Sequence, residues 1–198
     1  MTEIPRLQEK YAGLEISFEG RQADMVESMS SLKTNFIFAM FVVYLLLAIP
    51  FKSYTLPFIV MVSIPFSVIG AVIGHAIMGY DLSVLSLFGI VALAGVVVND
   101  SLILIDHAIY LRNASPEKSA REIILTAVTQ RFRQIVLTTL TTFGGLAPMI
   151  METSRQAKTL IPMAISIGFG SIFATLITLI LIPSLYVVID DVRKRIRI

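Results

Sequence analysis

The chain has 198 residues, of which 56% are hydrophobic and only 15% charged, and its mean hydropathy is +0.81. A soluble domain carries about 25% charged residues, so this chain is expected to lie in a lipid bilayer or inside a larger assembly. The absence of cysteine excludes disulfides and thiolate metal sites, two histidines are too few for a histidine-built metal site, and a net charge of +2 gives no support to nucleic-acid binding.

Residues 1–31 differ in pattern from the rest of the chain. Apolar and polar side chains alternate over 14–19, which is the period of a half-buried strand, and 22–32 favours a helix that leads into the membrane. A single strand needs partners for its edge and its apolar face. We therefore expect residues 1–31 to be the remnant of a larger domain outside the membrane, which leaves open whether Met1 is the native start.

The remaining residues, 32–198, are predicted to form an all-α membrane bundle. A helix that crosses a bilayer needs roughly 20 mostly apolar residues. Only four charged residues lie between Thr34 and Leu111, and none lies between Thr159 and Ile189. Five stretches meet the requirement: 32–50, 56–78, 84–111, 132–151 and 159–189.

The distribution of lysine and arginine predicts the orientation. Ten of the 16 basic residues fall on the side that holds Lys52, the segment 112–133 and the C-terminus, whereas the short loops on the other side carry only Arg155 and Lys158. Short loops rich in Lys and Arg stay in the cytoplasm. The C-terminus is therefore expected to be cytoplasmic and the N-terminal segment to lie outside.

A further helix is predicted over 116–130, between the third and fourth spans. Ser115 is a suitable N-cap, Pro116 suits the first helical position, and apolar residues then recur at helical spacing. Two interpretations stay open, an amphipathic helix on the inner membrane surface or an ordinary connecting helix.

Small residues predict where the helices pack closely. Gly70 and Gly74 form a GxxxG pair, and Ser166, Gly170 and Ala174 follow one another at four-residue spacing. Such faces let backbones approach in lipid, where apolar burial gives no driving force. We expect these five residues to serve helix packing.

Asp100 is the candidate for chemistry, because it lies about 20 Å along the third span and hence inside the hydrocarbon layer. Insertion scales put the cost of a charge at the centre at about 2.5–3.5 kcal/mol. One interpretation is a proton or cation relay; the other is a carboxyl satisfied by Asn99, Ser101 and a neighbouring hydroxyl. His75 is expected to hydrogen-bond within the bundle, and His107 to lie at a solvated helix end.

No enzyme signature competes with a transport function. The chain has no glycine-rich phosphate loop and no metal cluster, and we expect no serine–histidine arrangement. Intramembrane aspartyl proteolysis needs two facing aspartates at depth, and this sequence offers one.

The run from Gly89 to Asp106, GIVALAGVVVNDSLILID, resembles a transmembrane helix of the resistance–nodulation–division (RND) efflux permeases, of the acriflavine-resistance type. The stretches 127–139 and 168–188 agree with it, and the resemblance covers nearly the whole chain. It implies spans eight to twelve of a twelve-span pump, with residues 1–20 closing the outer porter domain.

In that family a relay of aspartates, lysine, threonine and arginine couples proton uptake to export. The resemblance places Asp100, Thr138 and Arg131 in this relay, while Asn99 stands where multidrug members carry lysine, which leaves open whether Asp100 titrates or only hydrogen-bonds. It also implies a bacterial inner membrane, a homotrimer, the N-terminal half of the permease, a periplasmic adaptor and an outer-membrane channel, with the proton gradient as energy source and no cofactor.

We therefore expect the C-terminal membrane part of a proton-driven efflux transporter, a secondary active transporter rather than an enzyme. The alternatives are a non-transporting membrane scaffold or sensing bundle, and a member of the superfamily that exports lipid or another substrate. The substrate itself cannot be inferred, because in this family the porter domain contacts it.

Overall fold

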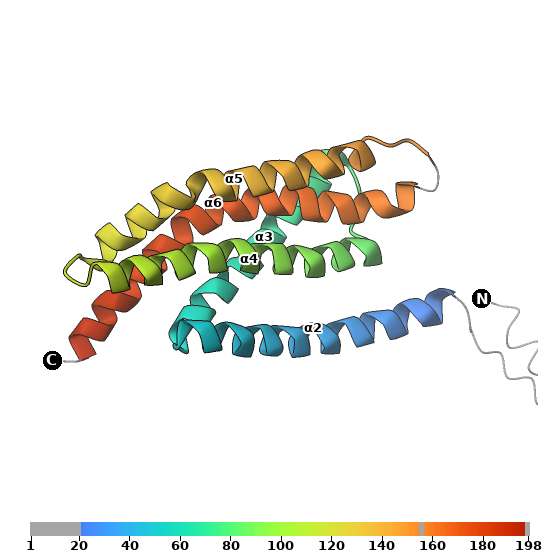
Figure 1. The fold of residues 1–198 in the computed structure, drawn as a ribbon. Helices are drawn as coiled ribbons and strands as arrows, with labels where there is room; N and C mark the ends of the chain where they lie inside the picture. The colour runs from blue at the N-terminus through green and yellow to red at the C-terminus, as the bar shows by residue number, and fades with distance from the viewer. Residues whose placement is uncertain (1–20, 155–156, 197–198) are drawn as a thin grey trace, which may run out of the picture. The chain divides into compact units, whose positions relative to one another are not determined.

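The computed structural model describes residues 21–154 and 157–196, and these form five helices and no strand (Figure 1). The helices are α2 (Arg21–Phe51), α3 (Thr55–Met78), α4 (Val84–Ala114), α5 (Ala120–Ile150) and α6 (Ala157–Ile196). This confirms the all-α bundle expected from the sequence. The predicted strand at 14–19 and the rest of 1–20 lie outside the described residues.

The chain divides into two units, Met1–Ala39 and Met40–Ile198. The predicted lead-in helix and the first predicted span form one helix, because α2 runs from Arg21 to Phe51. The second unit contains the rest of α2 and the packed helices α3 to α6.

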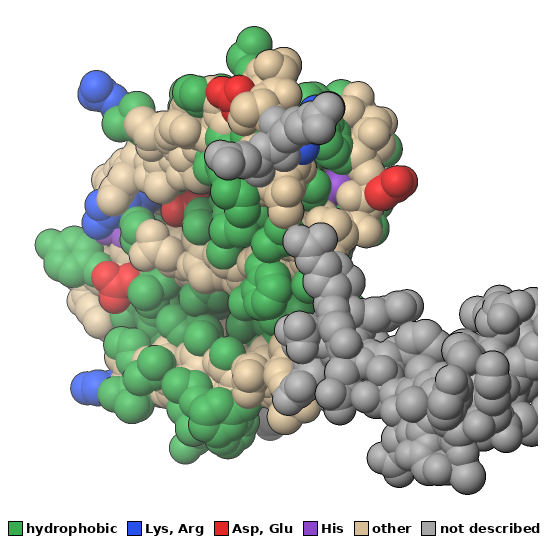
Figure 2. Space-filling model, turned by 90° about the vertical axis from the view of Figure 1, so that its right-hand side faces the viewer, with side chains coloured by type: hydrophobic (Ala, Val, Ile, Leu, Met, Phe, Trp, Pro, Cys, Tyr) green, Lys and Arg blue, Asp and Glu red, His purple; other side chains and the backbone are tan. Residues whose placement is uncertain are grey.

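Four of the helices are long and apolar enough to cross a bilayer, judged by length and composition within the described residues: Ser31–Phe51, Thr55–Met78, Val84–Ala114 and Ala157–Val192. They coincide with four of the five predicted spans. The fifth prediction, 132–151, lies in α5, which is long enough but more polar because Arg131, Arg133 and several threonines lower its hydropathy. Figure 2 shows hydrophobic side chains over much of the surface turned to the viewer, with charged side chains scattered among them.

The predicted boundary between a surface helix at 116–130 and the span that follows is wrong, because α5 is one uninterrupted helix. The predicted N-cap, Ser115, is also wrong. The cap is Ser119, whose hydroxyl accepts the Glu122 N–H at 3.3 Å while the Glu122 carboxylate accepts the Ser119 N–H at 3.1 Å. This reciprocal capping box fixes the first turn four residues later than expected.

Helix α6 is the centre of the packed unit, since it lies against α3, α4 and α5 (Figure 1). It runs in the same direction as α4 and opposite to α5. Asp190, near the end of α6, forms ion pairs with Arg112 of α4 at 3.1 Å and with Lys194 at 2.7 Å. The pair with Arg112 joins the C-terminal ends of α4 and α6, and the pair with Lys194 lies within α6.

Buried apolar side chains form three clusters. Cluster 1 joins the ends of α2, α3, α4, α5 and α6 and consists of Leu47, Phe51, Ile59, Val60, Leu104, Ile105, Ala108, Ile123, Ile124, Ala127, Ile135 and Ile182. Cluster 2 joins the middle of α3, α4 and α6 and consists of Ala71, Leu93, Val97 and Ala174. Cluster 3 lies where α5 ends and α6 begins and consists of Ile150, Ile161, Ala164 and Ile165.

Candidate functional site

Asp100 lies on the face of α4 that is turned to α3 and α6, and its side chain is only 5% exposed. Val97 and Leu104, three and four residues away, share its helix face. Val97 packs in cluster 2 with Ala71 of α3 and Ala174 of α6, and Leu104 packs in cluster 1. Asp100 is therefore placed between two apolar clusters, in the interior of the packed unit.

The other helices also place polar side chains between these clusters. On α3, Ser67 lies four residues from Ala71, and on α6, Thr178 lies four residues from Ala174; both are buried, at 0% and 1% exposure. We call the buried polar side chains at this level the polar layer: Ser63, Ser67, Asp100, Ser101, Thr139, Thr175 and Thr178. Hydroxyls from α3, α5 and α6 thus lie at the level of one carboxyl on α4.

Only part of the polar layer is hydrogen-bonded internally. The hydroxyls of Thr139 and Thr175 lie 2.5 Å apart and join α5 to α6, and the Ser67 hydroxyl donates to the Ile64 carbonyl at 2.6 Å. Asp100 Oδ1 and the hydroxyl oxygens of Ser63 and Ser101 are buried, and none of the three has a hydrogen-bond partner within 21–154 and 157–196. A buried polar group without a partner costs free energy, most of all when it is charged.

No cationic side chain is available to Asp100 from the helices that surround it. Helix α3 contains no Lys or Arg, and residues 159–189 of α6 carry no charge. On α5, Arg131 donates to the Gln134 amide oxygen at 2.8 Å and to His107 Nδ1 at 3.4 Å, and Arg133 is exposed. Within the described chain, Asp100 is therefore a buried carboxyl without a counter-ion.

The residues predicted for a relay are not brought into one hydrogen-bonded network. Asn99 is exposed, since adjacent residues of a helix point about 100° apart. The half-buried Thr138 donates its hydroxyl to the Gln134 carbonyl at 2.9 Å, a bond within its own helix. Asp100 is buried with its Oδ1 unbonded within the described chain, whereas Arg131 bonds to His107.

From the sequence, His107 was expected at a solvated helix end, and its hydrogen-bond partners were not predicted. His107 is half-buried, its Nε2 donates to the Gln130 amide oxygen at 2.6 Å, and its ring stacks on Tyr110 with centroids 6.0 Å apart. Since Nδ1 accepts from Arg131, this arrangement requires the neutral ring. The partners lie 23 and 24 residues further along the chain, so only the packing of α4 on α5 reveals them.

His75 is buried and hydrogen-bonded within the bundle, as expected. Its Nδ1 donates to the Ala71 carbonyl at 2.9 Å, so its Nε2 accepts from the Ser86 hydroxyl at 2.8 Å. The expectation of no serine–histidine arrangement is therefore wrong. Ser86 is fully buried and belongs to the capping box of α4 with Ser83, so the pair joins α3 to α4 and has no access for a substrate.

The small residues predicted for packing lie at close helix contacts. A Cβ atom added to Gly70 or Gly74 would overlap the side chain of Phe173 or Phe169 of α6, respectively. On Gly170 it would overlap Leu93 of α4. The two other residues of the set, Ser166 and Ala174, are buried on the same helix.

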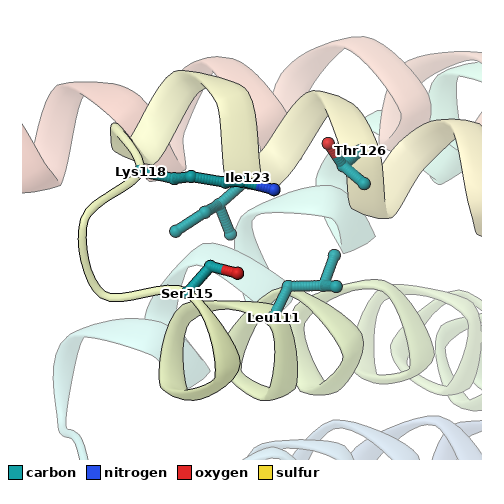
Figure 3. A pocket seen from close by; sticks show the side chains of 5 residues that line it. All are labelled: Leu111, Ser115, Lys118, Ile123 and Thr126. Atoms are coloured by element: carbon teal, nitrogen blue, oxygen red, sulfur yellow. The ribbon is translucent and has the colours of Figure 1, made fainter.

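The hollow in Figure 3 is too small for a substrate. It lies between the end of α4 and the start of α5, has a volume of about 20 Å³ and is lined by Leu111, Ser115, Lys118, Ile123 and Thr126. This is room for about one water molecule. The described residues also contain no group of three His, Cys, Asp or Glu side chains able to hold a metal ion.

Comparison with known proteins identifies relatives over almost the whole chain. The model of the AcrB/AcrD/AcrF family matches residues 1–190. The swarming motility protein SwrC of Bacillus subtilis (strain 168) is 32% identical over 177 residues, which are 89% of this chain and 17% of that protein. The multidrug resistance protein MdtC of Pantoea ananatis (strain AJ13355) is 31% identical over 180 residues, which are 90% of this chain and 17% of that protein.

The fold is similar to that of a solved heavy metal efflux pump, with a TM-score of 0.76 and 23% identity over 95% of this chain and 19% of the pump. This likeness concerns the fold alone. The chain spans 17% of the length of both curated relatives. The family match and the apolar helices together show a multi-pass membrane protein, and the chain belongs to the AcrB/AcrD/AcrF family of RND permeases.

Proposed function

We propose that this chain is the C-terminal membrane part of an efflux permease that exports drugs or other amphiphiles in exchange for protons. The observation that carries the proposal is Asp100, a carboxyl buried in an apolar span with no cation beside it. Ionisable residues at such depth mark ion pathways and proton relays in transporters. The family membership supports efflux, and the name of MdtC supports drugs as the cargo.

In this proposal a proton neutralises Asp100, and its release leaves a charge between two apolar clusters. The charged and neutral forms favour different packing of α3, α4 and α6 around the carboxyl, because the charged form requires additional polar contacts. A conformational equilibrium that depends on protonation is what proton-coupled export needs. Asn99 stands where the family resemblance implies a lysine beside Asp100, so no lysine at that position supplies the compensating charge of the relay.

The exposed polar side chains of α4 and α5 support the proposal that another part of the permease packs against these helices. Within the predicted spans, α4 and α5 expose the polar side chains of Asn99, Gln134 and Thr141 beside apolar ones such as Leu137 and Leu140, whereas the exposed side chains of α3, such as Ile69, are apolar. Polar side chains in a bilayer face protein or a water-filled cavity rather than lipid. We propose that the N-terminal half of the permease covers this polar side and that lipid covers the apolar side.

The assembly follows from the family resemblance and is part of the same proposal. It is a homotrimer in a bacterial inner membrane with a cytoplasmic C-terminus, joined to a periplasmic adaptor and an outer-membrane channel. The excess of basic residues on the side of Lys52 and the C-terminus supports this orientation.

The test is substrate-dependent proton flux in inverted membrane vesicles that contain the complete pump. Asp100→Asn should lower the flux and the export severalfold, and Thr138→Ala should weaken both. Thr129→Ala is the matched control, since Thr129 makes the same bond to the carbonyl four residues earlier, at 2.9 Å, but is not one of the residues proposed for the relay.

Full activity of Asp100→Asn would contradict the relay role. Absence of any proton flux in the unmodified pump would instead support the scaffold or sensing alternative, in which Asp100 only specifies helix pairing.

A further inference from the structure

We propose that the polar layer is a binding site for one small monovalent cation, with the Asp100 carboxylate and the surrounding hydroxyls as ligands. The inference shares Asp100 with the proposed function but does not depend on transport, and sodium is the ion with which it is tested. Three features of the described residues carry it: the charge balance, the type of ligand atoms and the orphaned oxygens.

The described residues provide no positive charge that would balance Asp100 when it is ionised, and a bound cation would supply one. Helix α3 offers only His75, which is occupied by its bonds to Ala71 and Ser86, and residues 159–189 of α6 offer no charge. Arg131 of α5 is bonded to His107 and Gln134. Asp106 on α4 and Lys52 after α2 are exposed, as is Arg133 of α5. Within residues 21–154 and 157–196, the negative charge of an ionised Asp100 is therefore left without a partner.

The other polar side chains of the layer are all hydroxyls, so its candidate ligand atoms are oxygens. The carboxylate comes from α4, and the hydroxyls of Ser63, Ser67 and Thr178 come from α3 and α6, at the same level between clusters 1 and 2. Oxygen ligands suit hard cations. A single carboxylate matches a monovalent ion, since calcium sites use six to eight oxygens and usually several carboxylates.

The buried oxygens without a hydrogen-bond partner favour a bound ligand over hydrogen bonds within the protein. Asp100 Oδ1, Ser101 Oγ and Ser63 Oγ are all more than nine-tenths buried, and within the described chain none has a hydrogen-bond partner. Some other buried hydroxyls of the same helices are bonded, such as Ser171, which donates to the Gly168 carbonyl at 2.9 Å. Ser166 of α6 is the buried hydroxyl outside the polar layer that likewise has no hydrogen-bond partner within the described chain. Buried polar atoms in proteins are almost always satisfied by protein, water or an ion.

A proton and a sodium ion compete for the same carboxylate in this site, and the test uses that competition. N,N′-dicyclohexylcarbodiimide is apolar and reacts with protonated carboxyls: the acid oxygen adds to the carbodiimide carbon, the proton moves to nitrogen, and no group leaves. Native membranes are treated at fixed pH and ionic strength with choline, Na⁺, Li⁺ or K⁺. Mass spectrometry then gives the labelling rate of Asp100.

We expect Na⁺ to slow the labelling of Asp100 severalfold relative to choline. Ser67→Ala and Thr178→Val each remove one hydroxyl and should raise the Na⁺ concentration needed for protection, while the rate in choline stays unchanged and shows that the fold is intact. Ser171→Ala is the matched control, since it removes a bonded hydroxyl of α6 outside the layer. Protection by Li⁺ or K⁺ as well would support the site with lower selectivity.

Labelling rates that are equal in Na⁺, Li⁺, K⁺ and choline would overturn the proposal, as would protection that both hydroxyl variants retain in full. A second measurement, thermal unfolding, needs no chemical label. Na⁺ should raise the unfolding temperature of the purified native protein and leave that of Asp100→Asn unchanged, because a ligand stabilises only the state that binds it. An equal response of the two proteins would also overturn it.

Discussion

Substitution of Gly89 by alanine should push α4 and α6 apart. A Cβ atom at this position would lie 2.7 Å from the Met163 carbonyl oxygen and 2.8 Å from the Ser166 Cβ. Ordinary contacts begin at 3.4 Å, so the first distance is 0.7 Å too short. Because the opposing atom belongs to the backbone of α6, a side-chain rotation cannot relieve the overlap.

The size of the effect follows from the contacts that the separation would weaken. A radial gap of about 0.5–1 Å forfeits a quarter to a half of each dispersion contact. In lipid this loss has no hydrophobic compensation. Overpacking of this kind costs about 1–3 kcal/mol, partly offset by about 1 kcal/mol from the better helix propensity of alanine.

Gly95→Ala is the matched control on the same helix, since a Cβ at Gly95 meets nothing within 4 Å. Both variants gain the same helix propensity, so the difference between their free energies of unfolding isolates the steric cost of about 1–3 kcal/mol. The measurement is reversible unfolding in mixed micelles, followed by circular dichroism. Agreement of the two variants within about 0.5 kcal/mol would refute the close contact of α4 with α6 at Gly89.

Two further predictions concern individual hydrogen bonds. Thr139→Val and Thr175→Val should show a coupling energy of about 0.6 kcal/mol in a double-mutant cycle of unfolding, since their hydroxyls lie 2.5 Å apart; strictly additive effects would contradict the bond. In the loop after α5, the backbone N–H groups of Ser154 and Thr153 donate to the exposed Glu152 carboxylate and lower its pKa below 4.5. The bonds should therefore persist at neutral pH and be lost only as the pH falls through this lowered pKa, and NMR titration of the two amides checks the midpoint.

Most of the fold could be predicted because each helix carries its own signal. Apolar runs of sufficient length marked α3, α4 and α6, and charge placement marked the loops between them. The start of α5 could not be fixed in this way, because Ser115 and Ser119 are both plausible caps. Only Ser119 has a glutamate three residues later, and this capping-box spacing indicates the observed start.

The candidate site could be predicted only in its central residue. Asp100 was identified by its depth alone, but its environment depends on the register of three helices. The spacing of Val97, Asp100 and Leu104 predicts part of this environment, because it places the Asp100 carboxyl on the buried face of α4. Asn99 lies outside that face. The bond between His107 and Arg131 joins two helices and has no signature in the sequence of either.

The position of α6 at the centre of the packed unit has a consequence for biogenesis. Chains fold from the N-terminus as they leave the ribosome, and here α3, α4 and α5 enter the membrane before the helix on which all three pack has been made. Until then, the glycine faces of α3 and the carboxyl of α4 have no α6 to cover them. The nascent protein therefore passes through a stage in which a lipid-exposed acid must stay protonated or be shielded by an insertase, and the synthesis of α6 ends that stage.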